Sequence, residues 1–364
     1  MTIHLYASLG DRNKTAAGGG QTSARRLVKV LEGLGYEVQV VNRIIPAYTS
    51  ESLVEKIHKI AGYFIDPFRY FFHLLFKSRR NGVSFVIMYA GRLFPFYFSF
   101  VRIGKLLGFR TVIYIKGSFT KDKYQSLSTR MKESYASGLR KVDLAFYEGK
   151  DGEETSLKVN PQTKAVWLPN YIENDFMPKC LVKRDLEPIN IMYFGRLDPG
   201  KNIILVVETF DLLCQRLDNI RLNIVGSGES EYTKLIEKRI SQSPYKDRII
   251  RTSRIDHDKL KEFLPSQHFY LFPTESEGHS NALTEAMAYG VVPIASRRGF
   301  NASVVGNDSI IVDEMKAEAY RDVVMNVLEN DIFDSLSNEM FERVRTHFNQ
   351  TVVEKKLANE LNLL

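Results

Sequence analysis

The sequence predicts an α/β fold of two doubly wound, Rossmann-like domains that face each other across a central cleft. The chain has 364 residues, which is more than one ordinary hydrophobic core supports, so two domains are expected. Short apolar runs alternate with longer amphipathic runs, and this alternation begins again near Ile189. Such alternation is typical of βαβ units in parallel sheets, because parallel neighbours need a crossover connection.

The first domain is expected at residues 1–170. Its strands are predicted at the apolar runs 3–7, 37–41, 83–89, 111–115 and 144–147. A glycine-containing loop follows the first run. Apolar residues at helical spacing then predict a helix that begins at Ala24 and is ended by Gly35.

The second domain is expected at residues 171–345, after a boundary near Pro169. Strands are predicted at residues 189–194, 222–225, 269–272 and 291–295, and helices at residues 202–217, 231–241, 258–264 and 281–289. The remaining segment, 346–364, ends in a helical pattern that is expected to return to the first domain.

Composition limits the kinds of protein that this chain can be. A hydrophobic content of 44% and a charged content of 26% argue against wholesale disorder. We expect a cytoplasmic protein, since there is no signal-peptide pattern and no apolar run long enough to span a bilayer. Cys180 and Cys214 lack metal-ligand spacing and are expected to be buried thiols. The net charge of +7 favours an anionic partner, but no nucleic-acid-binding motif is found, so no nucleic acid partner is expected.

Residues 275–290 form the segment with the most chemical information. A polar loop follows a predicted strand, and a helix capped by Ser280 or Asn281 and stopped by Gly290 comes next. The free N–H groups at such a helix start suit a phosphate. Glu277 and Glu285 would repel phosphate and should face ribose or sugar hydroxyls. From spacing alone, two surface acids are an equally good interpretation.

The string Glu-Gly-x-x-Asn-x-x-x-Glu-Ala-Met-Ala-x-Gly, from Glu277 to Gly290, resembles the signature of the retaining glycosyltransferases of family four. The resemblance implies the GT-B fold and a nucleotide-sugar donor, with no metal or other cofactor. It implies that Glu285 binds the donor ribose and that Glu277 lies near the sugar and the reacting centre. It also implies contacts to the sugar and the diphosphate from the loop residues Gly278, His279, Ser280 and Asn281.

A second motif begins at Gly195, where a predicted strand ends. Arg196 and Lys201 are two cations near a helix start, which suits a diphosphate, although a turn with solvated basic residues is the alternative. The string resembles the Gly-Arg-Leu-x-x-x-Lys element of the same family. The resemblance implies that Arg196 and Lys201 neutralise the leaving diphosphate in place of a metal, and that they act together with Glu277.

Two weaker motifs lie between these segments. Gly226 and Gly228 resemble the family's glycine turn beneath the nucleotide, although a plain tight turn fits equally well. Arg254 and Ile255 occupy the place where the family contacts the base. The Asp-His-Asp string at 256–258 is interpreted as a helix cap rather than a metal site, so no metal is predicted.

In the first domain, Gly18, Gly19 and Gly20 resemble the family's N-terminal glycine loop, which approaches donor and acceptor; a flexible loop is the alternative. Lys116 and Gly117 end a predicted strand where many relatives carry His-Gly. The resemblance therefore implies an acceptor or donor loop at these five positions, with a departure at Lys116. A second departure is the string Arg-Gly-Phe-Asn at 298–301, where many relatives carry Gly-Gly.

Two stretches, 56–80 and 92–110, combine basic and aromatic residues. One hypothesis is an interfacial surface that attaches the enzyme to an anionic membrane face. The alternative, equally supported, is that these aromatics belong to the core.

Together these observations predict a retaining glycosyltransferase that moves a hexosyl or N-acetylhexosaminyl group from a nucleoside diphosphate sugar, with UDP as the expected nucleotide. The acceptor is expected to be a hydroxyl of a glycan or of a polyprenyl-linked saccharide, in polysaccharide, lipopolysaccharide or glycoconjugate assembly. Two alternatives are a nucleotide-sugar epimerase on the same fold and a non-catalytic scaffold that binds carbohydrate or membrane.

Overall fold

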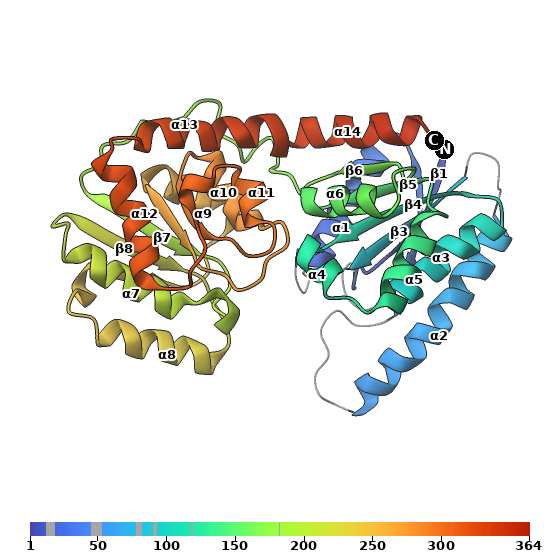
Figure 1. The fold of residues 1–364 in the computed structure, drawn as a ribbon, viewed down its shortest axis with the longest axis horizontal. Coiled ribbons are helices and arrows are strands. Elements are labelled where there is room, and N and C mark those ends of the chain that lie inside the picture. Colours follow the sequence, from blue (N-terminus) through green and yellow to red (C-terminus); the bar gives the residue numbers. More distant parts are fainter. Residues whose placement is uncertain (12–18, 45–52, 78–81, 90–92, 118, 182) are drawn as a thin grey trace. The chain divides into compact units, whose positions relative to one another are not determined.

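The computed structural model describes residues 1–11, 19–44, 53–77, 82–89, 93–117, 119–181 and 183–364 (Figure 1). The chain forms two compact units. The first contains Met1–Pro169 and Glu354–Leu364, and the second contains Asn170–Val353. Each unit holds one six-stranded parallel sheet with flanking helices, so the expected α/β class with two doubly wound sheets is confirmed.

The first sheet has the strand order β2-β1-β3-β4-β5-β6. Its strands are β1 (Thr2–Ala7), β2 (Glu37–Asn42), β3 (Gly82–Tyr89), β4 (Arg110–Lys116), β5 (Leu144–Tyr147) and β6 (Ala165–Trp167). β1 pairs in parallel with both β2 and β3, with Thr2 opposite Glu37 and Gly82. The five predicted strands are confirmed. β6 was missed because it has only three residues and no recognisable period.

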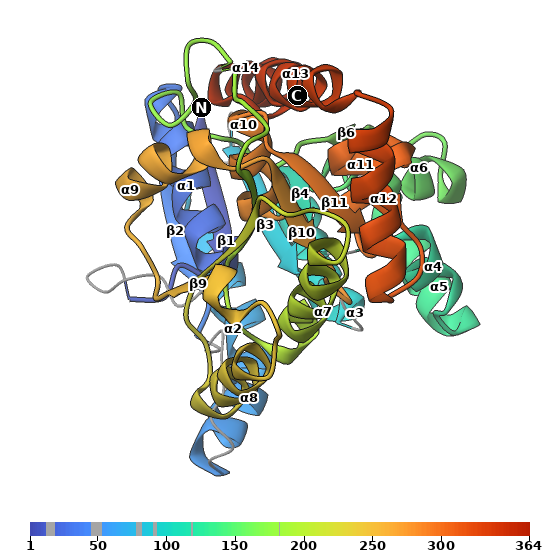
Figure 2. The ribbon, with the colours of Figure 1, turned by 90° about the vertical axis from the view of Figure 1, so that its left-hand side faces the viewer.

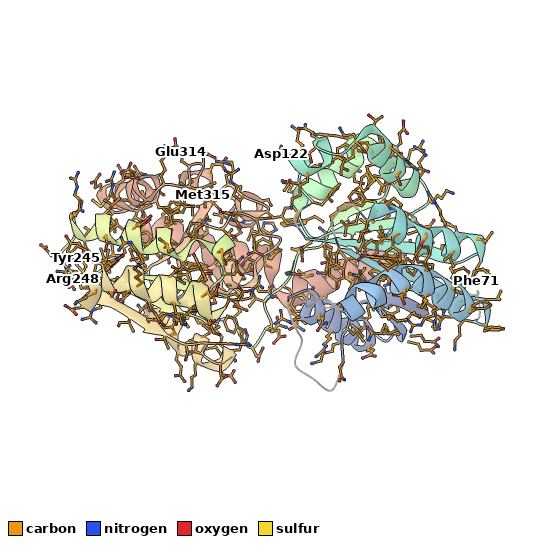
Figure 3. The ribbon with its side chains drawn as sticks, turned by 90° about the horizontal axis from the view of Figure 1, so that it is seen from below. Phe71, Asp122, Tyr245, Arg248, Glu314 and Met315 are labelled. Atoms are coloured by element: carbon orange, nitrogen blue, oxygen red, sulfur yellow. The ribbon has the colours of Figure 1, made fainter. Side chains whose placement is uncertain are left out.

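The helices of the first unit are α1 (Gly19–Gly33), α2 (Leu53–Leu75), α3 (Phe94–Leu106), α4 (Lys121–Gln125), α5 (Thr129–Leu139) and α6 (Lys150–Val159). α3 packs against both α2 and α5. The crossovers through α1 and α2 run in opposite directions along the sheet, so right-handed connections put these two helices on opposite faces. The core beneath α2 and α3 is rich in aromatic residues, and the partly buried Phe71, labelled in Figure 3, packs against it.

The aromatic residues of α3 belong to this core. Phe94, Tyr97, Phe98 and Phe100 are each at most 1% exposed. The ring of Phe100 stacks on that of Tyr6 at a centroid distance of 4.0 Å. The hypothesis of a membrane-facing stretch is therefore wrong for these residues of 92–110, because their side chains are buried in the core, where Phe100 packs on Tyr6 of β1 and Phe94 and Phe98 pack on Tyr135 of α5.

The second sheet has the order β12-β11-β10-β7-β8-β9. Its strands are β7 (Ile189–Phe194), β8 (Ile220–Val225), β9 (Ile249–Thr252), β10 (Phe269–Phe272), β11 (Val292–Ser296) and β12 (Ile311–Val312). The four predicted strands are confirmed, and the short strands β9 and β12 were missed. The chain adds β8 and β9 on one side of β7 and then β10 to β12 on the other side. The topological switch point therefore lies between β7 and β10.

The remaining helices are α7 (Ile203–Cys214), α8 (Ser230–Ser241), α9 (His257–Phe263), α10 (Asn281–Ala288), α11 (Asn301–Val305), α12 (Ala317–Glu329), α13 (Phe333–Arg343) and α14 (Gln350–Asn362). α7 contacts α8 and α12, whereas α10 contacts α13 (Figure 2). The end of α14 lies in the first unit, where Tyr36 donates a hydrogen bond to Asn362 at 3.0 Å and Lys164 pairs with Glu360 at 2.8 Å.

Two further expectations concern membrane spans and the cysteines. Among the residues that the structure describes, no helix is both long and apolar enough to cross a bilayer. Cys214 is buried as expected, but Cys180 is exposed because it lies in the irregular segment before β7.

Candidate active site

The candidate donor residues gather at one edge of the second sheet. Since its strands are parallel, the segments that follow β7, β8, β9 and β10 all leave from the same, carboxyl edge. Ligands of doubly wound sheets bind at this edge, at the switch point. The loop after β7 carries Arg196 and Lys201, and the loop after β10 carries Glu277. The two loops therefore flank the switch point between β7 and β10.

Two hydrogen bonds join the two loops. The backbone N–H of Glu275 donates to the carbonyl of Gly200 at 2.9 Å, and the side-chain amide of Asn202 donates to the carbonyl of Pro273 at 3.0 Å. Asn202 adopts a left-handed conformation, with φ of 51°, which ends the short turn before α7. These contacts fix the backbone that carries Lys201 next to the loop that carries Glu277.

Lys201 and Glu277 form an ion pair at this junction. Only 11% of the Lys201 side chain and 23% of the Glu277 side chain are exposed, so water screens the pair weakly. The ammonium also lies 3.5 Å from Oγ1 of Thr274 and 5.6 Å from the ring centroid of Phe272. The structure thus brings together two of the three predicted catalytic residues.

Arg196 is the more accessible of the two site cations. Its side chain is 68% exposed, and the guanidinium lies 3.3 Å from the carboxylate of Asp198. The Tyr193 hydroxyl donates to the Arg196 carbonyl at 2.7 Å, which anchors the backbone while the side chain remains exposed. The Arg196 guanidinium is therefore accessible to solvent at the end of β7.

The backbone geometry explains, without any ligand, why glycine is found at positions 195, 226 and 228. The backbone after β7 runs beside the backbone after β8, with hydrogen bonds from Gly195 to Val225 and from Leu197 to Ser227, both of 3.0 Å. A Cβ on Gly226 would lie 1.9 Å from the Gly195 carbonyl oxygen, and one on Gly228 would lie 1.8 Å from that of Leu197. Gly195 and Gly226 also have φ of 146° and 152°. The plain-turn interpretation therefore explains these glycines at least as well as a nucleotide does.

Glu285 lies in the second turn of α10. The Ser280 hydroxyl accepts from the N–H of Leu283 at 3.3 Å, so Ser280 caps this helix as predicted. Oε1 of Glu285 lies 3.2 Å from Nε2 of His257, whose ring stacks on Phe176 at a centroid distance of 4.3 Å. The buried Glu285 carboxylate thus contacts a histidine at the start of α9.

The other residues of the 278–281 loop make contacts within the second unit. His279 is buried, with Nε2 at 3.2 Å from Oγ1 of Thr284 and its ring edge-on to that of Phe348. The Asn170 amide donates to the His279 carbonyl at 3.1 Å and to Oδ1 of Asn281 at 3.3 Å. Gly278 is half-buried beside them. The contacts of His279 support the loop from beneath.

The departure at residues 298–301 lies directly against Glu277. A Cβ on Gly299 would lie 1.8 Å from the Glu277 carbonyl oxygen, and the N–H of Phe300 donates to that oxygen at 3.3 Å. Gly299 is therefore required for the loop after β11 to support the backbone of Glu277.

Arg254 and Ile255 lie between β9 and α9, with Arg254 exposed and Ile255 half-buried. Asp256 occupies the cap position of α9, but its side chain makes no capping hydrogen bond, so that part of the cap interpretation is wrong. Asp258 pairs with Lys261 at 3.1 Å. No group of three or more potential metal ligands is found in the part of the chain that the structure describes.

The candidate acceptor or donor loop belongs to the first unit. Gly18 lies outside the described residues, and Gly19 and Gly20 are the first two residues of α1. Lys116 is 3% exposed and lies 3.3 Å from Glu148, and its ammonium is 4.2 Å from the Tyr114 ring centroid.

Burial is the main reason why the pKa of Lys116 is lowered, and the charge of Glu148 opposes this effect. Glu148 also accepts from the N–H of Gly117 at 2.7 Å. The charge of Lys116 is therefore compensated inside the first unit.

Four residues of these sites were missed in the sequence: Thr274, Asp198, His257 as a partner of Glu285, and Glu148. Asp198 lies inside the Gly195–Lys201 motif and Thr274 directly precedes the 275–290 segment, so a search for polar neighbours of Lys201 could have found them. His257 and Glu148 contact residues 28 and 32 positions away, and no local pattern marks such pairs.

Comparison with known proteins shows a similarity to one family over the part of the chain that carries the candidate donor residues. Residues 182–347 match the family model "Glycosyl transferases group 1", and this range contains Arg196, Lys201, Glu277 and Glu285. The chain is 24% identical to a phosphatidylinositol N-acetylglucosaminyltransferase subunit from Arabidopsis thaliana, over 42% of this chain and 33% of that protein. It is 22% identical to the capsular polysaccharide biosynthesis glycosyltransferase CapM of Staphylococcus aureus, over 47% and 45%. The matches thus span less than half of these curated relatives.

The whole chain resembles solved structures in fold. Sucrose-phosphate synthase from Thermosynechococcus elongatus matches with a TM-score of 0.71 and 17% identity, over 100% of this chain and 98% of that one. HepE from Anabaena, solved in complex with UDP, matches with a TM-score of 0.72 and 9% identity over 100% of both chains. Both likenesses show a GT-B type fold. Over residues 182–347, which are less than half of the chain, the sequence thus resembles glycosyl transferases group 1, a family of transferase enzymes.

Proposed function

We propose that this protein transfers a sugar from a nucleoside diphosphate sugar to an acceptor hydroxyl, with retention of the anomeric configuration. One observation carries the proposal: the Lys201–Glu277 ion pair lies at the switch point between β7 and β10. A cation and a carboxylate side by side suit a donor whose diphosphate is anionic and whose sugar carries hydroxyl donors.

In the proposed reaction, Lys201 exchanges its partner Glu277 for the diphosphate of the donor. The diphosphate binds Lys201 and Arg196 and takes the place of Glu277 beside the lysine. Glu277 is then available to accept hydrogen bonds from the donor sugar, while Glu285 accepts them from the ribose. As the bond between sugar and phosphate breaks, negative charge grows on the diphosphate, and the two cations stabilise it. The role proposed for both Arg196 and Lys201 is therefore electrostatic.

The names of the relatives support finer parts of the proposal. HepE was solved with UDP, which favours UDP as the nucleotide. One relative is named for N-acetylglucosaminyl transfer to phosphatidylinositol and another for capsular polysaccharide biosynthesis. We therefore favour a hexosyl or N-acetylhexosaminyl donor and an acceptor that is a glycan or a lipid-linked saccharide. A lipid-linked acceptor would place the reaction at a membrane, which we propose to be the inner face of the cell membrane.

The test combines binding and turnover. Thermal-shift measurements with UDP-, GDP- and ADP-sugars should show stabilisation by one nucleotide class. Lys201→Ala and Arg196→Ala should each lower kcat/KM by roughly 30- to 900-fold, which corresponds to about 2–4 kcal/mol of transition-state stabilisation. Lys179→Ala is the matched control, since this exposed lysine lies outside the motifs.

Three results would contradict the proposal. If none of the nucleotide-sugars stabilises the protein, the proposed donor is contradicted. Near-native turnover in both alanine variants would contradict the proposed role of the two cations. Conversion of the donor to another nucleotide-sugar without an acceptor would favour an epimerase instead.

A further inference from the structure

Helix α2 (Leu53–Leu75) and the two residues after it have two apolar faces, of which only one is covered. The inward face is formed at a spacing of four by Gly62, Asp66, Tyr70 and Leu74, all of them buried. A second row has the same spacing and is exposed: Phe64 at 69%, Phe68 at 66%, Phe72 at 51% and Phe76 at 79%. The two rows are offset by two residues, about 200° around a helix, so the four phenylalanines lie opposite the core.

Four exposed phenylalanines in one row are unusual on the outer face of a helix. A helix that covers a sheet normally presents polar residues to water. A phenylalanine buries roughly 150–250 Å² when it is fully covered, and each of these four still exposes 51–79% of its surface, so together they form a contiguous apolar strip. Strips of this size mark binding surfaces on soluble proteins. Ile60 and Leu75, also exposed, extend the strip.

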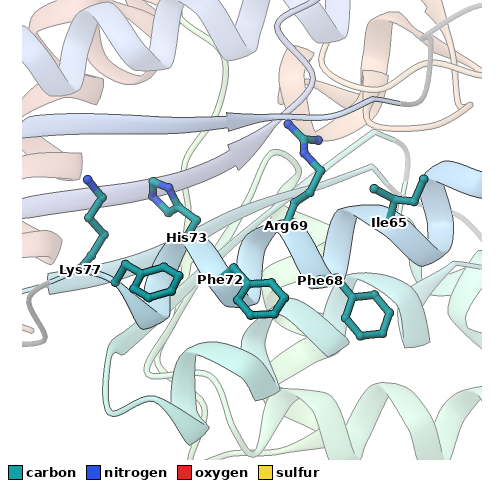
Figure 4. A pocket seen from close by; sticks show the side chains of 7 residues that line it. Ile65, Phe68, Arg69, Phe72, His73 and Lys77 are labelled. Atoms are coloured by element: carbon teal, nitrogen blue, oxygen red, sulfur yellow. The ribbon is translucent and has the colours of Figure 1, made fainter.

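A basic row runs beside the aromatic row. Figure 4 shows the rings of Phe68 and Phe72 on one side of α2, and the side chains of Arg69, His73 and Lys77 on the neighbouring side. Together with Ile65 and Phe76 they line one open groove. Arg69 is held in place by Asp66 at 2.7 Å and by the carbonyl of Asn42 at 3.2 Å.

The surface of α2 offers no acid to a partner over residues 60–77. Asp66 is the only acidic residue in this stretch, and it is fully buried. Besides Arg69, it accepts a hydrogen bond from the Tyr6 hydroxyl at 2.8 Å and one from the N–H of Ile44 at 3.2 Å. The charges that remain on the outside are therefore positive.

The positive charge of the whole chain is concentrated in the same unit. Residues 1–169 contain 26 lysines and arginines against 13 aspartates and glutamates, whereas residues 170–353 contain 22 against 28. The excess of positive charge and the aromatic strip therefore lie in the same part of the chain, residues 1–169. A large negatively charged partner would be attracted to the first unit and repelled by the second.

We propose that the exposed face of α2 docks onto an anionic lipid surface. The phenylalanine rings would enter the boundary between headgroups and acyl chains, while Arg69 and Lys77 would bind lipid phosphates. A second copy of the chain fits less well, because a symmetric contact through α2 brings two basic rows together. The surface belongs to the first unit and the donor residues belong to the second, so the inference stands whether or not the proposed reaction is right.

The test is flotation with phosphatidylcholine vesicles, with and without phosphatidylglycerol. The wild-type protein should float with the anionic vesicles and much less with the neutral ones. Phe68→Glu should lower the partition coefficient by roughly tenfold or more, because one ring is lost and a negative charge is added. Lys77→Glu should reduce binding to anionic vesicles alone. Leu235→Glu is the matched control, since this leucine on α8 is 53% exposed but lies in the second unit.

A second readout does not depend on these losses. In Phe72→Trp, anionic vesicles should shift the emission of the new tryptophan to the blue, and brominated lipids should quench it. Activity of Phe68→Glu on a soluble acceptor should be unchanged, which separates this surface from the donor site.

Three outcomes would overturn the proposal. One is equal flotation with both vesicle types, and another is no flotation and no quenching. The third is a concentration-dependent dimer that Phe68→Glu dissociates in the absence of vesicle binding, which would assign the surface to a second copy of the chain.

Discussion

Replacing Gly226 by alanine should destabilise the second unit even when no ligand is bound. The added Cβ would lie 1.9 Å from the carbonyl oxygen of Gly195, and φ at this position is 152°. Alanine rarely adopts this φ, and a Cβ essentially never approaches an oxygen closer than 3.0 Å. The backbones after β7 and β8 would therefore have to separate by about 1 Å or rotate at Gly226.

The cost can be estimated from the contacts that hold these two backbones together. The Gly195–Val225 and Leu197–Ser227 hydrogen bonds join them, and each contributes about 0.5–1.5 kcal/mol. A strained φ costs a further 1–3 kcal/mol or so. The free energy of unfolding of the second unit should therefore fall by about 2–6 kcal/mol in Gly226→Ala.

Urea denaturation followed by far-UV circular dichroism would measure this change. Tryptophan fluorescence is unsuitable, because the single tryptophan, Trp167, lies in the first unit. Hydrogen exchange measured by mass spectrometry would add the location: protection should fall in peptides that cover residues 191–198 and 222–228. Gly200→Ala is the control, since its Cβ would meet nothing closer than Asp198 at 3.5 Å.

A fall of less than about 0.5 kcal/mol, within the range of an ordinary surface substitution, would refute this reasoning. The close approach of the two backbones would then not constrain the loop. In that case the glycines of this motif would have to be explained by a bound nucleotide. A large fall in Gly200→Ala as well would show that the loop tolerates no side chain, and the contact between Gly226 and Gly195 would not be the specific cause.

Three further predictions concern charged groups. Glu277→Gln should tighten UDP binding by roughly two- to fivefold in calorimetry, because it removes the carboxylate that competes for Lys201, and it should lower the rate of sugar transfer. Unchanged or weaker UDP binding would contradict the proposal that the diphosphate replaces Glu277 beside Lys201. Lys116→Met should lower the free energy of unfolding, measured by urea denaturation, by about 3–5 kcal/mol, because it leaves Glu148 buried beside an apolar side chain. The double variant Lys116→Met with Glu148→Gln should recover part of the lost stability. Burial lowers the pKa of His4 from 6.5 to about 4, so the folded state resists protonation of this side chain. As the pH falls from 6.5 to 4, the free energy of unfolding of the wild type should therefore fall by up to about 3 kcal/mol relative to that of His4→Gln. Parallel pH profiles of the two proteins would contradict this.

The outline of the fold could be predicted because it depends on local pattern. The buried strand β10 is an uninterrupted apolar run, and β3 is interrupted only by Ser84, while the helices between the strands have a clear period. β9 was missed because only two of its four residues, Ile249 and Ile250, are apolar, and β12 was missed because it has two residues; each is seen only through its pairing, with β8 and with β11. Periodicity also failed to separate α2 from α3. Both are rich in phenylalanine, and only packing against the sheet decides which rings are covered.

The candidate site was predictable in composition but not in its internal pairing. The motifs place Arg196, Lys201 and Glu277 at the carboxyl ends of two strands. Strand order then makes these strands neighbours, although Lys201 and Glu277 are 76 residues apart along the chain. No feature of the sequence indicates that Lys201 pairs with Glu277 or that His257 contacts Glu285. These pairs depend on how loops from different strands meet, and a single sequence does not record that.

The internal pairing changes how the positive charge of this site should be understood. Arg196 lies beside Asp198 and Lys201 beside Glu277, so neither cation adds a free positive charge to the sheet edge in the structure. A diphosphate therefore gains attraction only as it displaces a carboxylate. For Asp198 the cost is small, because the Arg196 side chain is mostly exposed and water screens the pair. For Glu277 the cost is larger, because the pair is mostly buried, unless the released carboxylate finds a new donor. In the proposed reaction, a sugar hydroxyl attached to the same diphosphate would supply that donor. The arrangement therefore favours a ligand that carries both a diphosphate and a sugar over one that carries the diphosphate alone.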